Sequence, residues 1–312
     1  MAGESRLHPS QGPEGEAGQP ESEPTVAPRV HAARLFGDGE VVCARYRITR
    51  LIGFGGMAQV YEAEDLELHD QVALKAIRPE IALDEQAIAR FRREIQLSRR
   101  ITHPNVCRVF DIAHHRTPAG AGIALLTMEL LSGETLDGRL GRAGRMSAAE
   151  ALPIARQMTE GLAAAHRAGV IHRDFKSANV MLAPSAGEGE RAVVTDFGLA
   201  HSLVDTDRLL LTGSGQLLGT LAYMAPEQLA GAEVTPATDV YALGIVLYEM
   251  VTGVRPFDKT ALLKRLSEGP PSPRLRAPEL DPRWDTVIQR CLEPDPARRF
   301  QTATDVIRAL EG

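Results

Sequence analysis

The sequence has little cysteine, few aromatic residues and no long apolar run. Its 312 residues include three cysteines, Cys43, Cys107 and Cys291, which lie far apart and form no Cys-x-x-Cys pair. This number and spacing exclude a disulfide framework and a zinc site. We therefore interpret each cysteine as a small apolar residue of a protein in the reducing cytoplasm.

A segment that could cross a membrane is also missing. A spanning helix needs about 20 apolar residues, whereas the apolar run 240–251 is shorter and contains Glu249. We expect this run to form a buried core helix. The N-terminus is polar and acidic, which is not the pattern of a secretory signal.

Basic residues are not in excess, and the formal net charge is -6. This balance argues against a nucleic-acid-binding surface. Residues 1–43 carry seven acidic and three basic side chains, and residues 1–30 include five prolines and four glycines. Such a segment buries too little apolar surface to offset its ordering entropy. We predict a disordered acidic tail over 1–43 and one folded domain over 44–312.

The remaining sequence, with 44% hydrophobic and 24% charged residues overall, is typical of a globular protein. Short β-rich runs predict strands at 46–52, 59–65, 71–77, 106–114 and 123–129, with one helix over 84–100. After residue 131 the pattern is helical: Ser147 and Glu150 form a capping box, and Gly169 marks a helix end. We therefore predict an α+β fold with a small lobe over about 44–130, a mainly helical lobe over about 131–312, and a cleft between them.

A glycine-rich segment, Ile-Gly-Phe-Gly-Gly-Met-Ala-Gln-Val, spans residues 52–60 between two predicted strands. Glycines allow the backbone to approach a phosphate and to offer N–H donors. An ordinary hairpin turn explains the segment equally well. A dinucleotide fingerprint is excluded because a strand follows, and a P-loop because no Gly-Lys-Ser/Thr follows.

Charged residues recur at places where an apolar residue would be expected. Lys75 lies in an apolar strand and needs an anion, which Glu94 on the next helix can supply; an ordinary structural ion pair is the alternative. In the loop 172–179, Asp174 could accept a hydroxyl proton and Asn179 could bind a metal, although a solvated loop is equally consistent. Asp196 follows a predicted strand, where a hard cation could bind.

Together and in this order, these segments resemble the signature of the protein-kinase family: glycine loop, strand lysine, helix glutamate, His-Arg-Asp…Asn, Asp-Phe-Gly and Ala-Pro-Glu. The resemblance covers residues 46–310. It extends to the Ala-Pro-Glu segment that ends at Glu227, to Asp239 at the start of the central helix, and to Arg298, which matches the arginine that pairs with Glu227. It implies the bilobal kinase fold and a structural Glu227–Arg298 ion pair.

The resemblance also implies roles for individual residues and the use of ATP with Mg²⁺, for which Mn²⁺ could substitute. The implied catalytic residues are Lys75, Glu94, Asp174, Lys176 and Asn179. Asn179 and Asp196 are the implied metal ligands. The implied nucleotide-binding residues are Ile52, Gly53, Phe54, Gly55, Gly56, Ala58, Val60, Ala73, Lys75, Met128, Glu129, Leu131, Met181 and Asp196.

Lys176 and Thr220 are similar to the serine/threonine branch, and the glycine loop resembles that of bacterial members. The expected substrates are serine and threonine hydroxyls of proteins, with no nucleic-acid partner. Two alternatives are a pseudokinase that signals by shape, and a kinase for small molecules, which the Ala-Pro-Glu segment argues against. The end of the chain at Gly312 fits a stand-alone kinase and equally a piece of a longer receptor kinase.

Four residues depart from the family pattern. Ala58 stands where the family has a third glycine, Phe175 where it has leucine, and Ser177 where it has proline. Ser98 stands where the family prefers an apolar residue that packs behind Phe197. Arg173 implies control by phosphate on the activation segment. The candidate hydroxyls are those of Thr206, Thr212, Ser214 and Thr220. We expect Thr212 and Ser214 to be autophosphorylated first, in trans, through self-association.

Overall fold

The computed structural model describes residues 34–55, 58–78, 85–117, 120, 122–185, 187, 189–197, 221–257 and 269–312, with the backbone alone over 85–91. All statements below concern these ranges. The part of the predicted acidic tail over 1–33 lies outside them.

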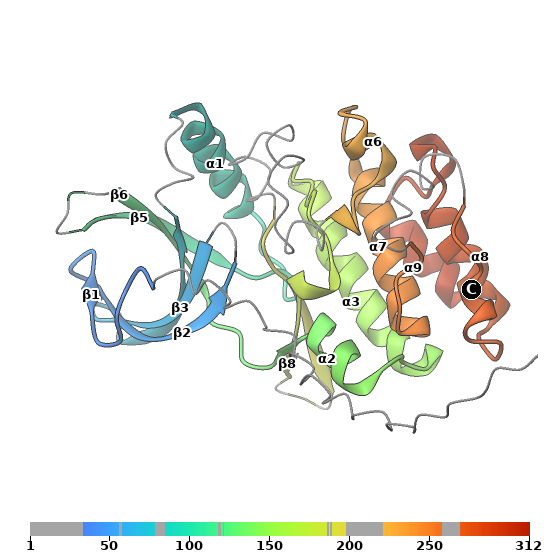
Figure 1. The fold of residues 1–312 in the computed structure, drawn as a ribbon, viewed down its shortest axis with the longest axis horizontal. Helices are drawn as coiled ribbons and strands as arrows, with labels where there is room; N and C mark the ends of the chain where they lie inside the picture. Colours follow the sequence, from blue (N-terminus) through green and yellow to red (C-terminus); the bar gives the residue numbers. More distant parts are fainter. Residues whose placement is uncertain are drawn as a thin grey trace, which may run out of the picture. The chain divides into compact units, whose positions relative to one another are not determined.

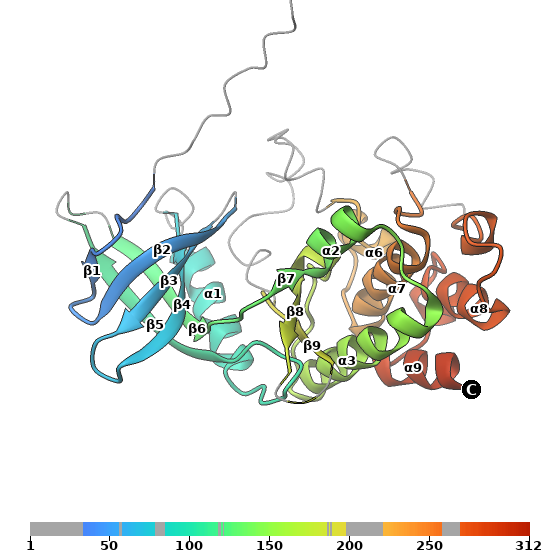
Figure 2. The ribbon, with the colours of Figure 1, turned by 90° about the horizontal axis from the view of Figure 1, so that it is seen from below.

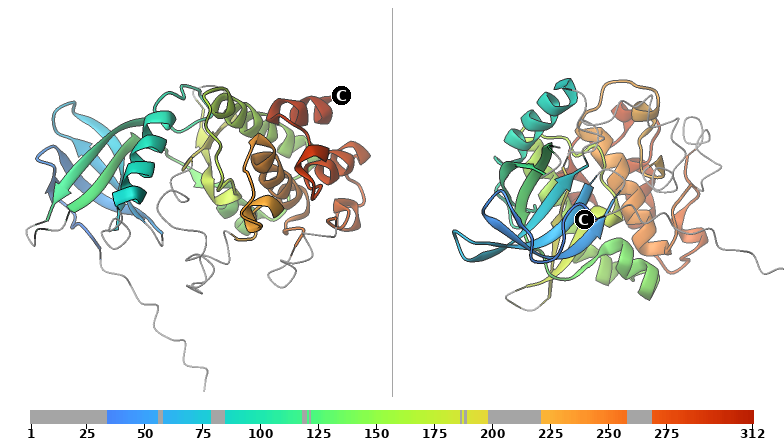
Figure 3. Two further views of the ribbon diagram at one scale, coloured as in Figure 1. Left: turned by 90° about the horizontal axis from the view of Figure 1, so that it is seen from above. Right: turned by 60° about the vertical axis from the view of Figure 1, so that its left-hand side comes forward.

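The small lobe is a six-stranded antiparallel sheet with one helix (Figure 1). The strands are β1 (Val41–Val42), β2 (Tyr46–Phe54), β3 (Ala58–Asp65), β4 (Asp70–Ile77), β5 (Val109–Arg116) and β6 (Gly122–Glu129), in the spatial order β1-β2-β3-β4-β6-β5. The helix α1 (Glu85–Ser98) packs beside β5 (Figure 3). Alternating burial along β3 places Tyr61 and Ala63 in the sheet's core, as the period-two pattern requires.

The predicted strands and helix of this lobe are confirmed, with one shift. The fourth predicted strand, 106–114, begins only at Val109. The reason is that residues 105–107 bond to a different sheet: the Cys107 N–H donates to the Val194 carbonyl, and the Val194 N–H donates to the Asn105 carbonyl, both at 2.9 Å. This segment therefore joins the small lobe to the large one.

The folded part starts earlier than the expected boundary at residue 44. Phe36 is 2% exposed, its ring centroid lies 5.6 Å from that of Tyr61, and its N–H donates to the Tyr61 hydroxyl at 3.2 Å. β1 pairs with the start of β2. Residues 34–43 thus belong to the small lobe, because one buried aromatic residue and a two-residue strand anchor a segment whose composition resembles a tail.

The large lobe contains a small sheet and a group of helices (Figure 2). Its strands β7 (Glu134–Thr135), β8 (Val180–Pro184) and β9 (Glu190–Val194) form an antiparallel sheet. The helices are α2 (Leu136–Ala143), α3 (Ala148–Arg167), α6 (Pro226–Leu229), α7 (Pro236–Thr252), α8 (Pro282–Cys291) and α9 (Ala303–Glu311), with single 3₁₀ turns η1 (Ser177–Asn179), η3 (Pro273–Leu275) and η4 (Pro296–Arg298).

The signals that predicted α3 and α7 are confirmed. Ser147 and Glu150 form the predicted capping box, α3 continues through Pro153, and Gly169 follows its end at φ 76°. Residues 237–252 of α7 are all buried, against α3, α8 and α9. None of the helices described here is long and apolar enough to cross a membrane.

Candidate active site

The glycine-rich segment forms the turn between β2 and β3. Gly53 pairs with Val60, and the Gly55 N–H donates to the Ala58 carbonyl at 2.9 Å. A Cβ atom at Gly53 would lie 3.3 Å from Val60 Cβ, so this close pairing leaves little room for a side chain. Ala58 is 6% exposed and packs in a small core cluster, so its methyl group is accommodated away from the turn. Gly56 lies outside the described residues.

Lys75 lies in the middle of the sheet, opposite Val60 on one side and Leu126 on the other. Its Nζ is 2.7 Å from Asp196 Oδ1, and its side chain is largely buried. Burial raises the pKa of Asp196, but the nearby Lys75 ammonium outweighs it, so this pKa lies below its usual range. The ion pair connects β4 to the residue that follows β9.

The predicted pairing of Lys75 with Glu94 is not the one observed. Glu94 Oε1 lies 3.5 Å from Arg173 Nη1, whereas Lys75 contacts Asp196. The physical reason is the position of α1, which places Glu94 beside Arg173 of the loop 172–179 (the catalytic loop), while the Asp196 carboxylate lies within reach of Lys75.

The loop 172–179 brings three predicted catalytic residues together. Lys176 Nζ lies 2.8 and 3.0 Å from the two carboxylate oxygens of Asp174. The Asn179 amide donates to the Asp174 carbonyl at 2.8 Å, and Asn179 itself lies in η1. Since the Asn179 nitrogen is the donor, its Oδ1 is the atom that remains for a cation.

Asp239 fixes this loop from the start of α7. Its buried carboxylate accepts the backbone N–H groups of His172 and Arg173 at 2.8 and 2.9 Å, and His166 Nε2 lies at 2.7 Å. Arg173 and Asp196 both adopt φ 63°, a left-handed conformation that is unusual for residues other than glycine. Such strained positions persist where surrounding contacts hold them, and they concentrate at functional sites.

The residues expected to contact the adenine are distributed over five strands, β2, β3, β4, β6 and β8, and the segment after β6. Ala73 on β4 lies opposite Met128 on β6, and Met181 on β8 lies opposite Val193 on β9. The other expected contacts, Val60, Ile52, Phe54 and Leu131, are half-buried or exposed. These apolar side chains remain partly exposed near Lys75, so they could contact a flat apolar ligand.

Glu129, at the end of β6, anchors the segment between the lobes. Its N–H donates to the Arg108 carbonyl at 2.9 Å, and its carboxylate forms an ion pair with Arg191 on β9. The segment expected to meet the adenine edge is therefore tied to both lobes.

A buried polar network links the catalytic loop to the segment that precedes α6. The Tyr223 hydroxyl donates to Glu249 Oε2 at 2.7 Å and lies 2.9 Å from Ser177 Oγ. Arg255 lies over the Tyr223 ring and 3.4 Å from the Glu249 carboxylate. Burial raises the pKa of Glu249, and burial together with the Glu249 charge raises the pKa of Tyr223. The serine at the position where proline was expected thus supplies a hydrogen bond.

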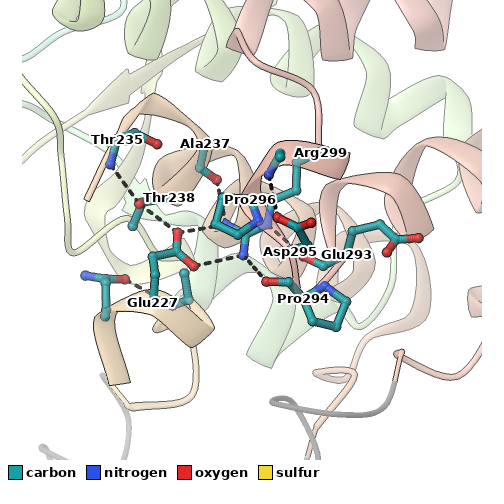
Figure 4. Close-up of polar contacts among 12 residues, drawn as sticks. Glu227, Thr235, Ala237, Thr238, Glu293, Pro294, Asp295, Pro296 and Arg299 are labelled. Atoms are coloured by element: carbon teal, nitrogen blue, oxygen red, sulfur yellow. Dashed lines mark hydrogen bonds and ion pairs between the residues drawn. The ribbon is translucent and has the colours of Figure 1, made fainter. Parts of the chain in front are cut away.

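The partner of Glu227 is Arg299, and the predicted pairing with Arg298 was wrong. Figure 4 shows Arg299 donating to both Glu227 oxygens, each at 2.8 Å, and to the carbonyl of Ala237. Arg299 is fully buried, whereas the Arg298 side chain is 69% exposed and pairs with Glu293. η4 ends at Arg298, and this turn directs the two neighbouring arginines in different directions.

A cavity lies behind Phe197, between α1 and the β5–β6 strands. Ile95 and Ser98 line it from α1, and Leu126 and Met128 line it from β6. Phe197 also contacts His172, with ring centroids 4.6 Å apart. Cys107 lines the same cavity, and burial raises the pKa of its thiol to about 12, so it is a neutral packing residue.

Some predicted features lie outside the described residues. The candidate phosphorylation sites Thr206, Thr212, Ser214 and Thr220 belong to this group. Within the described ranges, no set of three or more His, Cys, Asp or Glu side chains is placed to hold a metal ion. A magnesium ion held by one or two protein ligands and by substrate phosphates does not need such a set.

Sequence reasoning missed the contacts of Ser177, Tyr223 and Glu249, and the role of Arg299. A signal was present for one of them: Glu249 interrupts an otherwise apolar helix, and a buried carboxylate requires partners. No comparable signal distinguished Arg299 from Arg298, which are adjacent and chemically identical.

A strand lysine, a strained aspartate after β9 and an Asp-x-Lys-x-x-Asn loop, held between a β-rich lobe and a helical lobe, define the class of protein kinases. The model of the family "Protein kinase domain" matches residues 46–309. The chain belongs to this family, and its fold is the bilobal α+β kinase fold.

The chain is similar to bacterial serine/threonine-protein kinases. It is 38% identical to PknA of Mycobacterium tuberculosis over 268 residues, which cover 85% of this chain and 60% of PknA. It is 37% identical to pkn3 of Myxococcus xanthus over 272 residues, or 85% of this chain and 49% of pkn3. The crystal structure of the Mycobacterium tuberculosis PknI kinase domain matches with a TM-score of 0.70 at 27% identity, over 88% of this chain and 98% of that chain. The chain thus spans about half to three fifths of the length of these two full-length relatives.

Proposed function

We propose that this chain is a serine/threonine-protein kinase that transfers the γ-phosphoryl group of ATP to serine and threonine hydroxyls of proteins. The observation that carries the proposal is that the kinase fold holds two sets of charged side chains, one in the catalytic loop and one between β4 and the residue after β9. Asp174, Lys176 and Asn179 are held together in the catalytic loop, and Lys75 is held against Asp196.

In this proposal Asp174 orients the acceptor hydroxyl and takes its proton. A general base has to be fixed in place, and the Asp174 carboxylate is fixed by Lys176 and by the bonds of the loop to Asp239. Lys176 contributes positive charge beside the transferred phosphoryl group, whose negative charge is spread over three oxygens.

Lys75 is proposed to bind ATP phosphates, covered by the turn that contains Gly53, Gly55 and Gly56. A phosphate is an anion that can replace the Asp196 carboxylate as the partner of Lys75. Glu94 would then support Lys75 from α1. Ile52, Phe54, Ala58, Val60, Ala73, Met128 and Met181 are proposed to enclose the adenine and ribose, and Glu129 and Leu131 to meet the adenine edge.

Protein kinases use a divalent metal, and we propose Mg²⁺, with Mn²⁺ as a substitute. Asn179 Oδ1 and the Asp196 carboxylate would hold it. The donor set fits, because carboxylate and amide oxygens are the ligands that a hard cation prefers, and the pKa of Asp196 is low enough to keep it ionised. Bound there, the metal supplies positive charge that neutralises the phosphates.

We further propose that Thr212 and Ser214 become phosphorylated by a second copy of the chain, and that Arg173 receives the new negative charge. The relatives named above support phosphotransfer to proteins, whereas a nucleic-acid partner is not expected from a net charge of -6. The three free cysteines favour the reducing cytoplasm as the site of action.

The test is the intact mass of the purified chain after incubation with Mg²⁺ and ATP. We expect the wild type to gain phosphate and Asp174→Asn to do so at least about 10²-fold more slowly, since a general base contributes about 10²–10⁴ in rate. Asp70→Asn is the matched control, because Asp70 is exposed and remote from the catalytic loop in sequence. Thr212→Ala with Ser214→Ala should remove the first sites of modification.

Three results would contradict the proposal in different ways. Absence of both mass gain and ATP consumption would favour the pseudokinase. ATP consumption with transfer to a small molecule and none to protein would favour a small-molecule kinase. An equal rate for Asp174→Asn would reject the assigned base.

A further inference from the structure

The segment 34–36, which precedes the first strand, binds to β3 through a buried hydrogen-bond network. The Leu35 N–H donates to Gln59 Oε1 at 2.9 Å and lies 3.1 Å from the Tyr61 hydroxyl oxygen. The Phe36 N–H donates to the same hydroxyl oxygen at 3.2 Å, and this hydroxyl donates in turn to Gln59 Oε1. Gln59 and Tyr61 are 1% and 0% exposed, so their polar atoms depend on such partners rather than on water.

This network lies on the face of β3 that points away from Lys75. Val60 pairs directly with Lys75, and directly opposite residues of an antiparallel pair have their side chains on the same face of the sheet. Successive side chains of a strand point to opposite faces, so Gln59 and Tyr61, on either side of Val60, point to the reverse face. The segment 34–36 therefore supports β3 from behind, while Val60 faces the proposed nucleotide site.

The network also lies next to the glycine-rich turn. Gln59 pairs with Phe54 across the β2–β3 hairpin, and the carbonyl of Ala58 accepts the Gly55 N–H at 2.9 Å. A shift of Gln59 would thus shift the backbone N–H groups that the turn can offer to a phosphate. A turn that is already held in its binding arrangement loses less conformational entropy when the ligand binds, and this raises the affinity.

Phe36 anchors the segment to the rest of the small lobe. Its side chain is 2% exposed, and its ring centroid lies 5.6 Å from that of Tyr61 and 5.5 Å from that of His115 on β5. Further along the chain, the Gly39 N–H donates to the Ile48 carbonyl at 2.7 Å. The hold of the segment on Gln59 and Tyr61 thus depends mainly on one buried aromatic side chain.

We propose that the segment 34–36 is a positioning segment of the ATP site: by binding Gln59 and Tyr61 it holds the glycine-rich turn in its nucleotide-binding arrangement and so sets the affinity for Mg-ATP. Gln59 and Tyr61 are then positioning residues that act through the backbone of β3 and touch no nucleotide atom. This inference rests on the proposed function, because that function assigns the turn to the ATP phosphates.

The test uses four full-length variants. Phe36→Ala removes the anchor, Phe36→Leu keeps an apolar side chain there, and Tyr61→Phe removes the shared hydroxyl while it keeps the ring. Val42→Ala is the matched control, because Val42 is buried in the same apolar cluster and lies in the same N-terminal stretch, on β1, where it pairs with Tyr46.

Four quantities are measured for each protein after phosphatase treatment. They are the melting temperature, the Kd for Mg-ATP by calorimetry, the kcat and KM for ATP with myelin basic protein as acceptor, and hydrogen exchange of the backbone amides of β2 and β3 by mass spectrometry.

We expect Phe36→Ala to raise the Kd and the KM for ATP at least about fivefold, with kcat at saturating ATP within about twofold of the wild type and with faster exchange in β2 and β3. Tyr61→Phe should raise the Kd about threefold, and it replaces Phe36→Ala if that variant does not fold. Phe36→Leu should restore the Kd to within about twofold of the wild type. Val42→Ala should lower the melting temperature and leave the Kd within the same limit.

A wild-type Kd for Mg-ATP in folded Phe36→Ala or Tyr61→Phe would overturn the inference, and phosphate transfer by these variants would leave the proposed function intact. An equal rise in Kd for Val42→Ala would also overturn it, since loss of stability alone would then explain the effect. If the variants bound Mg-ATP more weakly as expected but neither they nor the wild type transferred phosphate, the positioning role would stand and the proposed kinase function would fail.

Discussion

Arg299 is the residue on which the packing of α6 against the rest of the large lobe depends. Its guanidinium is fully buried and binds Glu227 through two hydrogen bonds, in addition to the carbonyls of Ala237, Glu293 and Pro294. Removing one partner of a buried ion pair leaves an uncompensated charge, which costs about 3–5 kcal/mol. Arg299→Ala should therefore lower the free energy of unfolding by about this amount, measured by denaturant titration.

The adjacent arginine is the control for this prediction. Arg298 is exposed and its ion pair with Glu293 is 3.3 Å long, so Arg298→Ala should change the free energy of unfolding by less than about 1 kcal/mol. A larger loss for Arg298→Ala than for Arg299→Ala would contradict the assignment.

The Glu227–Arg299 pair also predicts a pH dependence. Burial raises the pKa of Glu227, but the hydrogen bonds and charge of Arg299 lower it by more, so the folded pKa lies below 4.5. A carboxyl with a depressed folded pKa stabilises the protein fully above its unfolded pKa and loses this effect as pH falls through the folded value. The difference in melting temperature between wild type and Glu227→Gln should thus be largest near neutral pH and should shrink below pH 4.5. A difference that stayed constant down to pH 3 would refute the assigned shift.

At this scale the sequence predicts contacts within a short segment better than contacts between distant ones. Asp174, Lys176 and Asn179 lie within six residues, so the backbone of one loop brings them together. The partner of Lys75 depends on where α1 lies, and no residue pattern contains that position. Whether Arg298 or Arg299 pairs with Glu227 depends on the residue at which the 3₁₀ turn η4 ends. Motif spacing does not locate the end of such a turn to within one residue.

At the scale of elements, the catalytic loop, the segment before α6 and the helix α7 are joined through Ser177, Tyr223 and Glu249. Since the Tyr223 proton is donated to Glu249, the Tyr223 oxygen accepts from Ser177, which is nearer to it, at 2.9 Å, than to its other acceptor, Asp137 Oδ1, at 3.5 Å. This bond connects η1, which carries Asn179, to the residues that follow the candidate phosphorylation sites. We infer that it transmits the arrangement of that segment to the catalytic loop.

Ser177→Ala and Tyr223→Phe should therefore each lower kcat for protein phosphorylation several-fold, because both remove the Ser177–Tyr223 hydrogen bond; Tyr223→Phe also removes the bond to Glu249 and should have the larger effect. The double variant should be little worse than Tyr223→Phe alone, with a coupling energy of about 0.5–3 kcal/mol in the range measured for contacting residues. The control is Tyr248→Phe, because Tyr248 is a buried tyrosine on α7 and its hydroxyl lies outside this network. Additive losses in the double-mutant cycle would show that the two hydroxyls act independently.

The elements themselves were largely predictable, because their signals are local. The capping box of α3, the alternation in β3 and the apolar run of α7 each determine an element without reference to the rest of the chain. The start of the folded region was harder to predict, since Phe36 is one apolar residue in a polar, glycine-containing stretch and only its contact with Tyr61 reveals its role.

At the scale of the whole molecule, the Lys75–Asp196 ion pair connects the small lobe to the large lobe through two residues that the proposed function assigns to ATP and its metal. Under the proposed function, nucleotide binding would exchange this contact for new ones: phosphate on Lys75, and the metal on Asp196 and Asn179. The exchange is complete only if both ATP and the metal are present, because ATP alone would leave the Asp196 carboxylate facing the phosphates without a cation between them.

Thermal stability should report this exchange. A ligand at 100 times its dissociation constant stabilises the folded state by about 2.7 kcal/mol, which corresponds to a rise in melting temperature of roughly 5–10 °C for a chain of this size. We expect that rise with ATP and Mg²⁺, a much smaller one with ATP and EDTA, and loss of the magnesium-dependent part in Asp196→Asn. Asp111→Asn, at an exposed aspartate on β5, should retain the full response. If ATP with EDTA stabilised the wild type as much as Mg-ATP does, Asp196 would not be a metal ligand, and its contact with Lys75 would be a structural ion pair that the nucleotide leaves in place.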